Sequence, residues 1–409
     1  MNLIVKLGWR NIWRNKRRSI ITILAVTFAV MLSIAMRGMQ LGTYAVNIRH
    51  VVKLYSGYVQ LQAEGYQDNP SLQKSFLLTD SLRTQIEQTP DVTGWTPRVA
   101  GDGLVSFRET SVGSRILGVD PRREETTSTL ATKISKGSFL TDAPEDAIVV
   151  GATLLDNLKA EIGDTVVVLA QGFDGSLGNM KYHIVGTLKT GSPDYDGGTI
   201  LMSLPAAQDL LSLYGRISMV AIMLDDLDAI DDVTESLNGS LSGSGVQALG
   251  WEEVMPDFAQ SIQLDNVSGM LMLAILIIVV AFGITNTVLM SVTERFREFG
   301  IVLAMGMPHQ KLVLVVLLET FFIVIIGLIL GNILAAGINA YLVAYPIEFG
   351  GEFQAIYEEY GFLPRLESTL KPTMFLNSSL AVLAISLLAT IYPLTKVLRL
   401  EPLKGIRYT

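Results

Sequence analysis

The chain has 409 residues, of which 49% are hydrophobic, and its mean hydropathy is +0.41. It is too apolar for an ordinary soluble protein and too polar for one lying wholly in a membrane, so membrane spans and a soluble domain are predicted together. The formal net charge of −8 argues against a nucleic-acid-binding protein, and the lack of cysteine excludes disulfides, thiolate nucleophiles and Cys-based metal sites.

Residues 1–19 are basic and lead into an apolar run. The cations of this segment are Lys6, Arg10, Arg14, Lys16, Arg17 and Arg18. A cleaved signal peptide would need a small-residue site after the apolar run, and Met36–Met39 does not provide one. We therefore interpret residues 20–41 as a first transmembrane helix and stem, retained as a signal anchor.

Three more apolar runs are each close to the roughly 20 residues that a membrane-spanning helix needs. The predicted second, third and fourth spans are residues 270–292, 312–334 and 374–394. They are separated by residues 42–269, 293–311 and 335–373, and a tail follows at residues 395–409.

The segment 42–269 is long enough for a domain with its own core. Alternating strands such as Thr165–Leu169 are mixed with helical stretches such as Ala152–Lys159 and Leu204–Tyr214. An α+β domain is predicted here.

The orientation follows from the short loops, because Lys and Arg are retained in the cytoplasm. The amino terminus, the 293–311 segment and the tail are basic, whereas the 335–373 loop is acidic. Both termini are therefore predicted to be cytoplasmic, with the 42–269 domain on the outer side.

No chemistry is predicted within this chain. A G-x-x-x-x-G-K-[ST] run, which would cradle nucleotide phosphates, does not occur. The histidines His50, His183 and His309 are too scattered to share a metal, and the acidic cluster 225–232 is interpreted as a solvated face. We therefore predict no catalytic, cofactor or metal site, so energy would have to come from a partner.

Several polar or small residues lie inside the predicted spans. For Asn286 and Asn332, interhelical hydrogen bonds are favoured over substrate contacts. Glu319 is either a relay or the partner of a basic residue at the cytoplasmic end. Gly327 and Gly331 form a G-x-x-x-G motif that permits close backbone approach.

The segment Thr293–Pro308 resembles a motif of the permease superfamily that includes FtsX, MacB and the lipoprotein-release permeases LolC and LolE. The family pattern E-R-x-R-E-[FI]-G-x-L-x-A-x-G is matched by Glu294, Arg295, Arg297, Glu298, Phe299, Gly300, Leu303, Ala304 and Gly306. Trp9–Asn11 is similar to the family's amphipathic N-terminal helix, and Arg399–Arg407 is similar to its closing motif.

The outer segment is similar to the family as well. Val149–Leu155 with Gly163–Asp164, and Val185–Pro193 with Asp196, look closest to the LolC/LolE branch. The resemblance implies a membrane bundle of four transmembrane helices with a large extracytoplasmic MacB-like α+β domain inserted between the first and second.

The matched residues of the 293–311 segment are the predicted ATPase-coupling site. A short charged helix can sit in a groove of a soluble protein, with Phe299 and Leu303 as apolar anchors four residues apart. Glu294 and Glu298 would repel each other unless Arg295, Arg297 or a partner's cation neutralises them. The alternative is a basic loop that touches lipid headgroups.

The resemblance implies a non-catalytic permease subunit in the bacterial inner membrane. It would work with an ABC ATPase dimer that binds ATP and Mg²⁺, and with a second permease copy or paralogue. Lipoproteins or other hydrophobic cargo would be released by mechanotransmission, in contact with membrane lipids and without nucleic acid. The alternatives are a MacB-like efflux permease and an FtsX-like regulator of a cell-wall hydrolase.

Overall fold

The computed structural model describes residues 3–141, 143–359 and 362–401, which divide into two compact units. The helical unit comprises residues 1–44, 262–348 and 365–409. The sheet unit comprises residues 45–261 and 349–364, so it takes a second segment from the loop predicted between the third and fourth spans.

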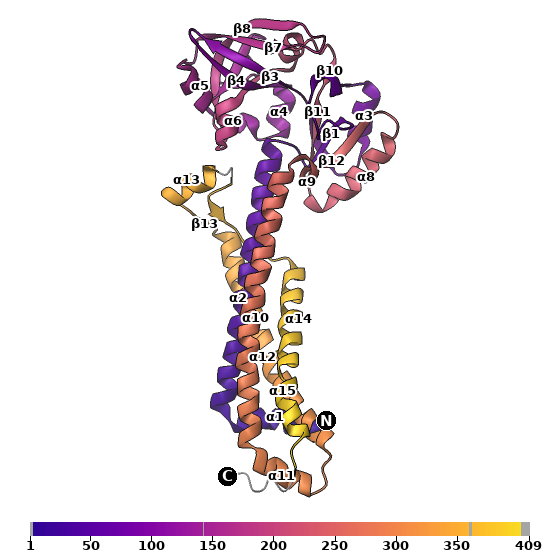
Figure 1. Cartoon of the computed structure of the whole chain (residues 1–409), viewed down its shortest axis with the longest axis vertical. Helices are drawn as coiled ribbons and strands as arrows, with labels where there is room; N and C mark the ends of the chain where they lie inside the picture. The colour runs from indigo at the N-terminus through magenta and orange to yellow at the C-terminus, as the bar shows by residue number, and fades with distance from the viewer. Residues whose placement is uncertain (1–2, 142, 360–361, 402–409) are drawn as a thin grey trace. The chain divides into compact units, whose positions relative to one another are not determined.

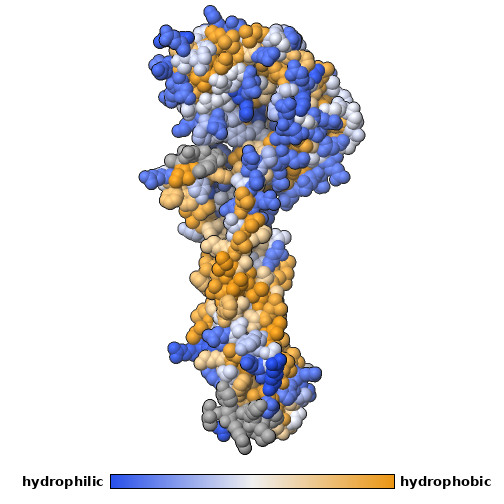
Figure 2. All heavy atoms as spheres, viewed as in Figure 1, coloured by the Kyte–Doolittle hydropathy of each residue, from blue (hydrophilic) through white to orange (hydrophobic). Residues whose placement is uncertain are grey.

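The helical unit contains the long apolar helices that hydropathy predicts. Its elements are α1 (Leu3–Arg14), α2 (Lys16–Leu54, which continues into the sheet unit), α10 (Pro256–Glu294), α11 (Phe296–Ala304), α12 (His309–Ala344), α14 (Pro372–Ala389), α15 (Ile391–Leu398) and the paired strands β13 (Ile347–Glu348) and β14 (Arg365–Leu366) (Figure 1). Among the described residues, four segments are long and apolar enough to cross a membrane: α2, α10, α12 and Pro372–Leu398. Figure 2 shows hydrophobic residues over the outside of these helices.

These helices are longer than the predicted spans, because hydropathy marks only the part of a helix that lies in lipid. α2 and α10 each have 39 residues, and α12 has 36. At about 1.5 Å per residue, α2 is about 58 Å long, nearly twice the roughly 30 Å of a hydrocarbon core. The predicted loop 335–373 likewise begins within α12 and contains α13 (Glu352–Glu359).

The Gly327–Gly331 motif lies where α12 packs against α2. A Cβ atom added to Gly327 would lie 2.7 Å from Val26, and one added to Gly331 would lie 2.7 Å from Val30. The Thr27 hydroxyl also donates to the Gly327 carbonyl oxygen at 3.4 Å. The prediction of close backbone approach is therefore confirmed, because only glycine leaves room for the valine side chains.

Polar side chains in the apolar helices behave in two ways. Asn332 on α12 donates to the Ser379 hydroxyl on α14 at 2.9 Å, so the predicted interhelical hydrogen bond is confirmed for this residue. Asn286 on α10 is instead exposed, and its side chain has no hydrogen-bond partner within the described part of the chain. The same prediction fails for Asn286 within a single copy.

α10 is attached to the rest of the helical unit mainly at two places. Three of its apolar side chains are buried near its C-terminal end: Ile284, Val288 and Val292. Further toward its N-terminal end, five polar side chains form a clamp between α2 and α10, made of Arg37, Gln40, Tyr44, Asp265 and Asn266. In this polar clamp Arg37 donates to the Asn266 side chain at 2.6 Å. Between these two places, large apolar side chains such as Ile275 and Phe282 are exposed.

The sheet unit is built on one ten-stranded sheet and is an α+β structure, as predicted. Its strands are β1 (Val59–Ala63), β3 (Val92–Phe107), β4 (Thr110–Val119), β5 (Ile134–Gly137), β6 (Ala147–Gly151), β7 (Thr165–Gln171), β8 (Leu177–Leu188), β9 (Thr199–Ser203), β11 (Met219–Leu224) and β12 (Val246–Gly250). A separate pair joins β2 (Phe76–Leu77) to β10 (Arg216–Ile217). The helices are α3 (Asp80–Gln88), α4 (Pro121–Thr127), α5 (Ala152–Leu158), α6 (Pro193–Gly198), α7 (Leu204–Leu210), α8 (Ile230–Ser240) and α9 (Trp251–Val254) (Figure 1).

Part of this sheet closes into a ring. The order is β3–β4–β9–β6–β8–β7, and β7 pairs with β3 again. Alternate side chains of these strands fill the inside and are buried, among them Val105, Ile116, Ile148, Val166, Val168, Ile184 and Ile200. From β3 the sheet continues through β11 and β1 to β12, and α8 packs on β1 and β12.

A buried ion pair holds the end of α2 in the sheet unit. Arg98 on β3 and Glu124 on α4 have side chains that are 2% and 0% exposed. Arg98 also donates to the carbonyl oxygen of Tyr55, the residue after α2, and Thr96 donates to Glu124 at 3.0 Å. Burial alone would lower the pKa of Arg98, but the adjacent Glu124 carboxylate outweighs it and raises that pKa.

Candidate functional site

The segment with the family motif forms a short helix between two long ones. α10 ends at Glu294, α11 runs from Phe296 to Ala304, and α12 begins at His309. Gly306 ends the turn after α11 with a φ of +97°, a left-handed conformation that favours glycine. Pro308 then precedes α12. These residues make α11 a separate element rather than a continuation of either long helix.

One face of α11 packs against its own bundle. Phe299 is 2% exposed and Leu303 is 8% exposed, and both belong to a core with Val292, Leu312 and Val316. These two side chains were predicted to anchor a separate protein, and their burial within the helical unit corrects that orientation. The spacing of four does place them on one face, but that face is used to hold α11 on the helical unit.

The opposite face of α11 is exposed. It carries Arg297 and Ile301, and Met305 follows at the end of the helix. Ile301 is 46% exposed and Met305 is 75% exposed. These three residues are spaced four apart, so they lie along one side of the helix. We call Arg297, Ile301 and Met305 the α11 surface.

The nine predicted site residues are therefore divided between the two faces. Phe299, Gly300 and Leu303 are buried, Arg295 is partly buried, and the remaining five are exposed, namely Glu294, Arg297, Glu298, Ala304 and Gly306.

Ion pairs connect the acidic residues of this segment to the N-terminal part of the chain. Arg14 Nη2 lies 2.8 Å from Glu298 Oε2, and Arg18 Nη2 lies 2.5 Å from Glu294 Oε1. The two carboxylates thus have cationic partners, as predicted, but Arg14 and Arg18 were not predicted as the partners. Arg297 forms no ion pair with the described residues.

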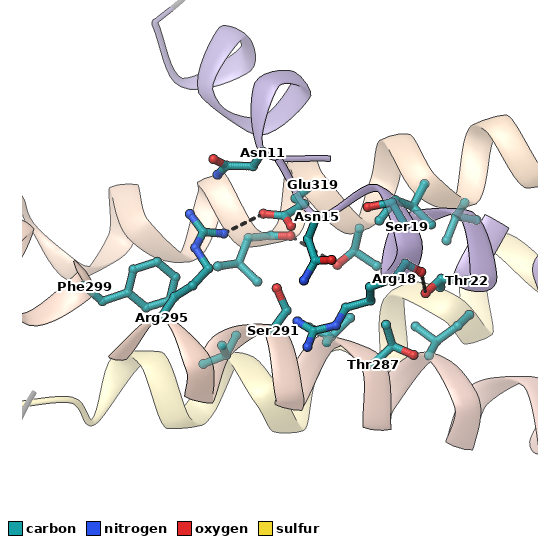
Figure 3. Close-up of a pocket in the computed structure, with 17 residues that line it drawn as sticks. Asn11, Asn15, Arg18, Ser19, Thr22, Thr287, Ser291, Arg295, Phe299 and Glu319 are labelled. Carbon is teal, nitrogen blue, oxygen red and sulfur yellow. Dashed lines mark hydrogen bonds and ion pairs between the residues drawn. The ribbon is translucent and has the colours of Figure 1, made fainter. Parts of the chain in front are cut away.

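Arg295 joins α11 to α12. Its Nε donates to Glu298 at 3.3 Å. Its Nη1 donates to Glu319 on α12 at 3.0 Å, and its guanidinium carbon lies 4.9 Å from the centre of the Phe299 ring (Figure 3). Glu319 therefore pairs with a basic residue, which is the second of the two alternatives drawn from the sequence. Arg295 also covers the ring that anchors α11, a cation–π arrangement.

Glu298 is held in its ionised form. Burial alone would raise the pKa of Glu298, but hydrogen bonds from Arg14 and Arg295 outweigh it and lower that pKa below its usual range. The carboxylate therefore stays charged from neutral pH down to its lowered pKa, and the pairing with Arg14 persists over that range.

A small cavity with both polar and apolar lining lies beside these ion pairs. Its volume is about 40 Å³, and its polar lining includes Asn11, Asn15, Arg18, Ser291, Arg295 and Glu319 (Figure 3). A cavity needs about 10–15 Å³ to hold one water molecule, so this space fits a few waters and no larger ligand. It can hydrate the Arg295–Glu319 pair.

The N-terminal and closing segments that carry the resemblance lie in the same helical unit as α11. Ile12 of α1 is buried with Ile23 and Ile323, and His309 at the start of α12 contacts the Leu400 carbonyl oxygen at 3.0 Å. The rest of the closing motif, residues 402–409, lies outside the described residues.

Comparison with known proteins gives consistent matches along the chain. Residues 19–239 match the MacB-like periplasmic core domain, and residues 270–402 match the FtsX-like permease C-terminal family. The lipoprotein-releasing system transmembrane protein LolC of Xylella fastidiosa is 24% identical over 78% of each chain. The macrolide export ATP-binding/permease protein MacB of Bdellovibrio bacteriovorus is 22% identical and covers 98% of this chain but 61% of its own length. The crystal structure of the periplasmic region of MacB from Actinobacillus actinomycetemcomitans covers 53% of this chain and 96% of its own, with 14% identity and a TM-score of 0.36.

The first of these family matches alone spans more than half of the chain. The second covers the α11 segment and the three helices around it that can span a membrane. The chain therefore belongs to the FtsX/MacB family of ABC transporter permeases, near the LolC and LolE proteins.

Proposed function

We propose that this chain is the membrane subunit of a transporter that uses ATP hydrolysis by a separate ATPase to release lipoproteins from the inner membrane. Members of its family work with an ABC ATPase, and LolC relatives named for lipoprotein release support this cargo class. The observation that carries the proposal is the α11 surface, which no described residue covers although the other face of the same helix is packed. The ATPase would bind the α11 surface and hold ATP and Mg²⁺ itself.

The position of α11 supports this role. α1 packs against α12 at Leu318 and Phe322. These residues lie about 14 and 20 Å along α12 from its start at His309, at about 1.5 Å per residue. The α11–α12 turn therefore lies beyond the place where α1 packs against α12. A helix in this place is accessible to a soluble partner.

The proposed orientation puts α11, α1 and the tail in the cytoplasm and the sheet unit outside. The basic character of the short segments supports it. In this arrangement the sheet unit is the extracytoplasmic domain inserted between the first and second spans. α2 and α10 would carry motion from the ATPase side to the outer side, which is mechanotransmission.

A second permease chain is part of the proposal. Asn286 lies within an apolar helix and is exposed, which is unfavourable in lipid unless a partner supplies a hydrogen bond. The neighbouring side chains Phe282 and Met290 are 71% and 54% exposed on the same helix. A second copy or a paralogue packed against this part of α10 would cover all three.

The docking proposal is tested with exposed residues of α11. Ile301→Asp combined with Met305→Asp should reduce copurification of the ATPase at least about tenfold, because it puts charge into an apolar contact. Ile162→Asp is a matched control, since Ile162 is 40% exposed on the sheet unit. Phe299→Asp is unsuitable, because it would disturb the core that holds α11. Equal copurification of the α11 variant and the control would overturn the docking proposal.

The cargo is tested with the purified complex in nanodiscs. Stimulation of its ATPase by an added lipoprotein, with release of that lipoprotein from the disc, is the expected result. Copurification of an outer-membrane channel without such stimulation would favour a MacB-like efflux permease. The match to MacB over 98% of this chain supports that alternative. Copurification of a cell-wall hydrolase would favour an FtsX-like regulator.

A further inference from the structure

Tryptophans and cations share the outward face of α1. Lys6, Trp9, Arg10 and Trp13 fall within an arc of about 100°, given about 100° per residue in an α-helix. Gly8 and Ile12 lie on the opposite side and are buried. Trp9 and Trp13 are 44% and 48% exposed. Such rings are costly in water and are stabilised at a membrane–water interface, where the ring meets both acyl chains and headgroups.

The charge around this face is of one sign. No Asp or Glu precedes Glu64 in the sequence, whereas six cations lie between residues 6 and 18. Arg14 and Arg18 are used in the ion pairs with Glu298 and Glu294. The other four are exposed and form no ion pair with the described residues, namely Lys6, Arg10, Lys16 and Arg17. This surface therefore has positive charge without a counter-charge from the residues that the structure describes.

We propose that this face binds anionic phospholipid headgroups, and we call Lys6, Trp9, Arg10, Trp13, Lys16 and Arg17 the α1 surface. Phosphate groups supply the negative charge that the protein lacks here, and the two tryptophans fix the depth of α1 in the interface. A zwitterionic headgroup offers no net charge to the four cations, so the surface selects anionic lipid. The partner is the lipid surface, because the rings require acyl chains beside the charge.

Bound lipid would lie next to the ion pairs that hold α11. Arg14 ends α1, and Lys16 and Arg17 directly precede Arg18. Negative headgroups on the α1 surface therefore sit beside both arginines that pair with the α11 segment. Lipid binding itself does not rest on the proposed transport function, whereas an effect of lipid on ATPase docking does.

Tryptophan quenching by brominated lipids tests this site in the full chain. The chain has four tryptophans, and Trp95 and Trp251 are buried in the sheet unit, so Trp95→Phe with Trp251→Phe leaves only the two of α1. Nanodiscs would contain equal amounts of phosphatidylglycerol and phosphatidylcholine, with bromine on the acyl chains of one or the other. We expect bromine on phosphatidylglycerol to quench about twofold more than bromine on phosphatidylcholine.

Charge variants separate binding from mere proximity. Replacing the four cations of the α1 surface by Gln should make the two brominated lipids quench equally. A control with four exposed cations of the sheet unit replaced by Gln, namely Arg115, Arg122, Lys136 and Lys181, should keep the difference. Before any cation is replaced, equal quenching by brominated phosphatidylglycerol and brominated phosphatidylcholine would already overturn the proposal. No quenching by either lipid would overturn it as well. If the unsubstituted chain keeps its preference for the anionic lipid but copurifies with no ATPase, that result would count against the proposed function and leave the lipid proposal intact.

Discussion

The buried Arg98–Glu124 ion pair is a single contact on which the stability of the sheet unit depends. Both side chains are removed from water. The charge of each is balanced by the other and by the hydrogen bonds from Thr96 to Glu124 and from Arg98 to the Tyr55 carbonyl oxygen. Removing one partner of such a pair costs more than removing both, because the remaining charge stays buried without compensation.

We therefore expect Glu124→Leu to reduce the free energy of unfolding by about 3–5 kcal/mol. The double variant Arg98→Met with Glu124→Leu should lose clearly less. Thermal unfolding of the full chain in detergent, followed by the fluorescence of Trp95 and Trp251 in the sheet unit, measures both. Glu125→Leu is the matched control, since Glu125 is adjacent and exposed. A double variant that is no more stable than the single one would contradict this account.

At the residue scale the sequence predicted the short helix between two spans better than the contacts of its side chains. The prediction that Glu294 and Glu298 need cationic partners, with Arg295 among them, is confirmed for Glu298, which Arg295 contacts at 3.3 Å. The additional partners Arg14 and Arg18 were not predicted. Arg14 and Arg18 are four residues apart, and so are Glu294 and Glu298. This equal spacing is the sequence signal that could have matched the arginines to the glutamates. Which face of an amphipathic helix meets its own protein depends on the neighbouring helices, so the burial of Phe299 could not be read from spacing.

At the scale of single helices, the contact between α2 and α12 depends on glycine. Gly331→Leu should lower thermal stability by about 1–3 kcal/mol, because the new side chain overlaps Val30. Gly337→Leu is a control in the same helix, where an added Cβ atom meets nothing within 4 Å. Unfolding of both variants in detergent gives the comparison. A similar loss for both would show that helix propensity rather than packing decides the effect.

The exposed asparagine of α10 gives a separate test. We expect Asn286→Leu to weaken association of two permease chains about fivefold, since an interhelical hydrogen bond in a membrane contributes roughly 1 kcal/mol. Förster transfer between labelled chains in bilayers measures this. Thr287→Val is the control, because the Thr287 hydroxyl already donates to the Gly283 carbonyl oxygen at 2.8 Å in its own helix. Unchanged association of the Asn286 variant would remove α10 from the interface.

The long helices were the easiest elements to predict, and their ends were the hardest. Apolar runs identify the part of a helix in lipid, but α2 continues for many residues in which hydropathy gives no signal. The strands of the sheet unit alternate recognisably, yet the closure of the ring between β7 and β3 joins residues about 65 apart in sequence, which local pattern cannot specify.

For the whole molecule, the polar clamp between α2 and α10 offers a way to test movement. The chain has no cysteine, so Gln40→Cys with Gly269→Cys gives one reactive pair at the place where a Cβ atom on residue 269 would lie 2.3 Å from the Gln40 side chain. Linking the two thiols with a short cleavable reagent should stop lipoprotein release but leave ATPase copurification intact. Release that continues in the linked complex would show that α2 and α10 need not separate.

Controls for this experiment come from the same variants. Each single cysteine treated with the reagent should release cargo normally, and cleavage of the linker should restore release in the double variant. Failure of the restored complex would point to damage by the substitutions rather than to the link.

The length of α2 and α10 has a mechanical consequence. Each runs for 39 residues without an internal proline, so it can act as a stiff lever arm. A tilt of about 10° at one end of a rod of about 58 Å moves the other end by about 10 Å. Each residue also turns the helix by about 100°, so inserting one residue in either stem would rotate everything beyond it out of phase. The number of residues in α2 and α10 therefore sets how far a tilt moves their far ends. The position of each added residue in the helical turn sets the direction in which those ends face.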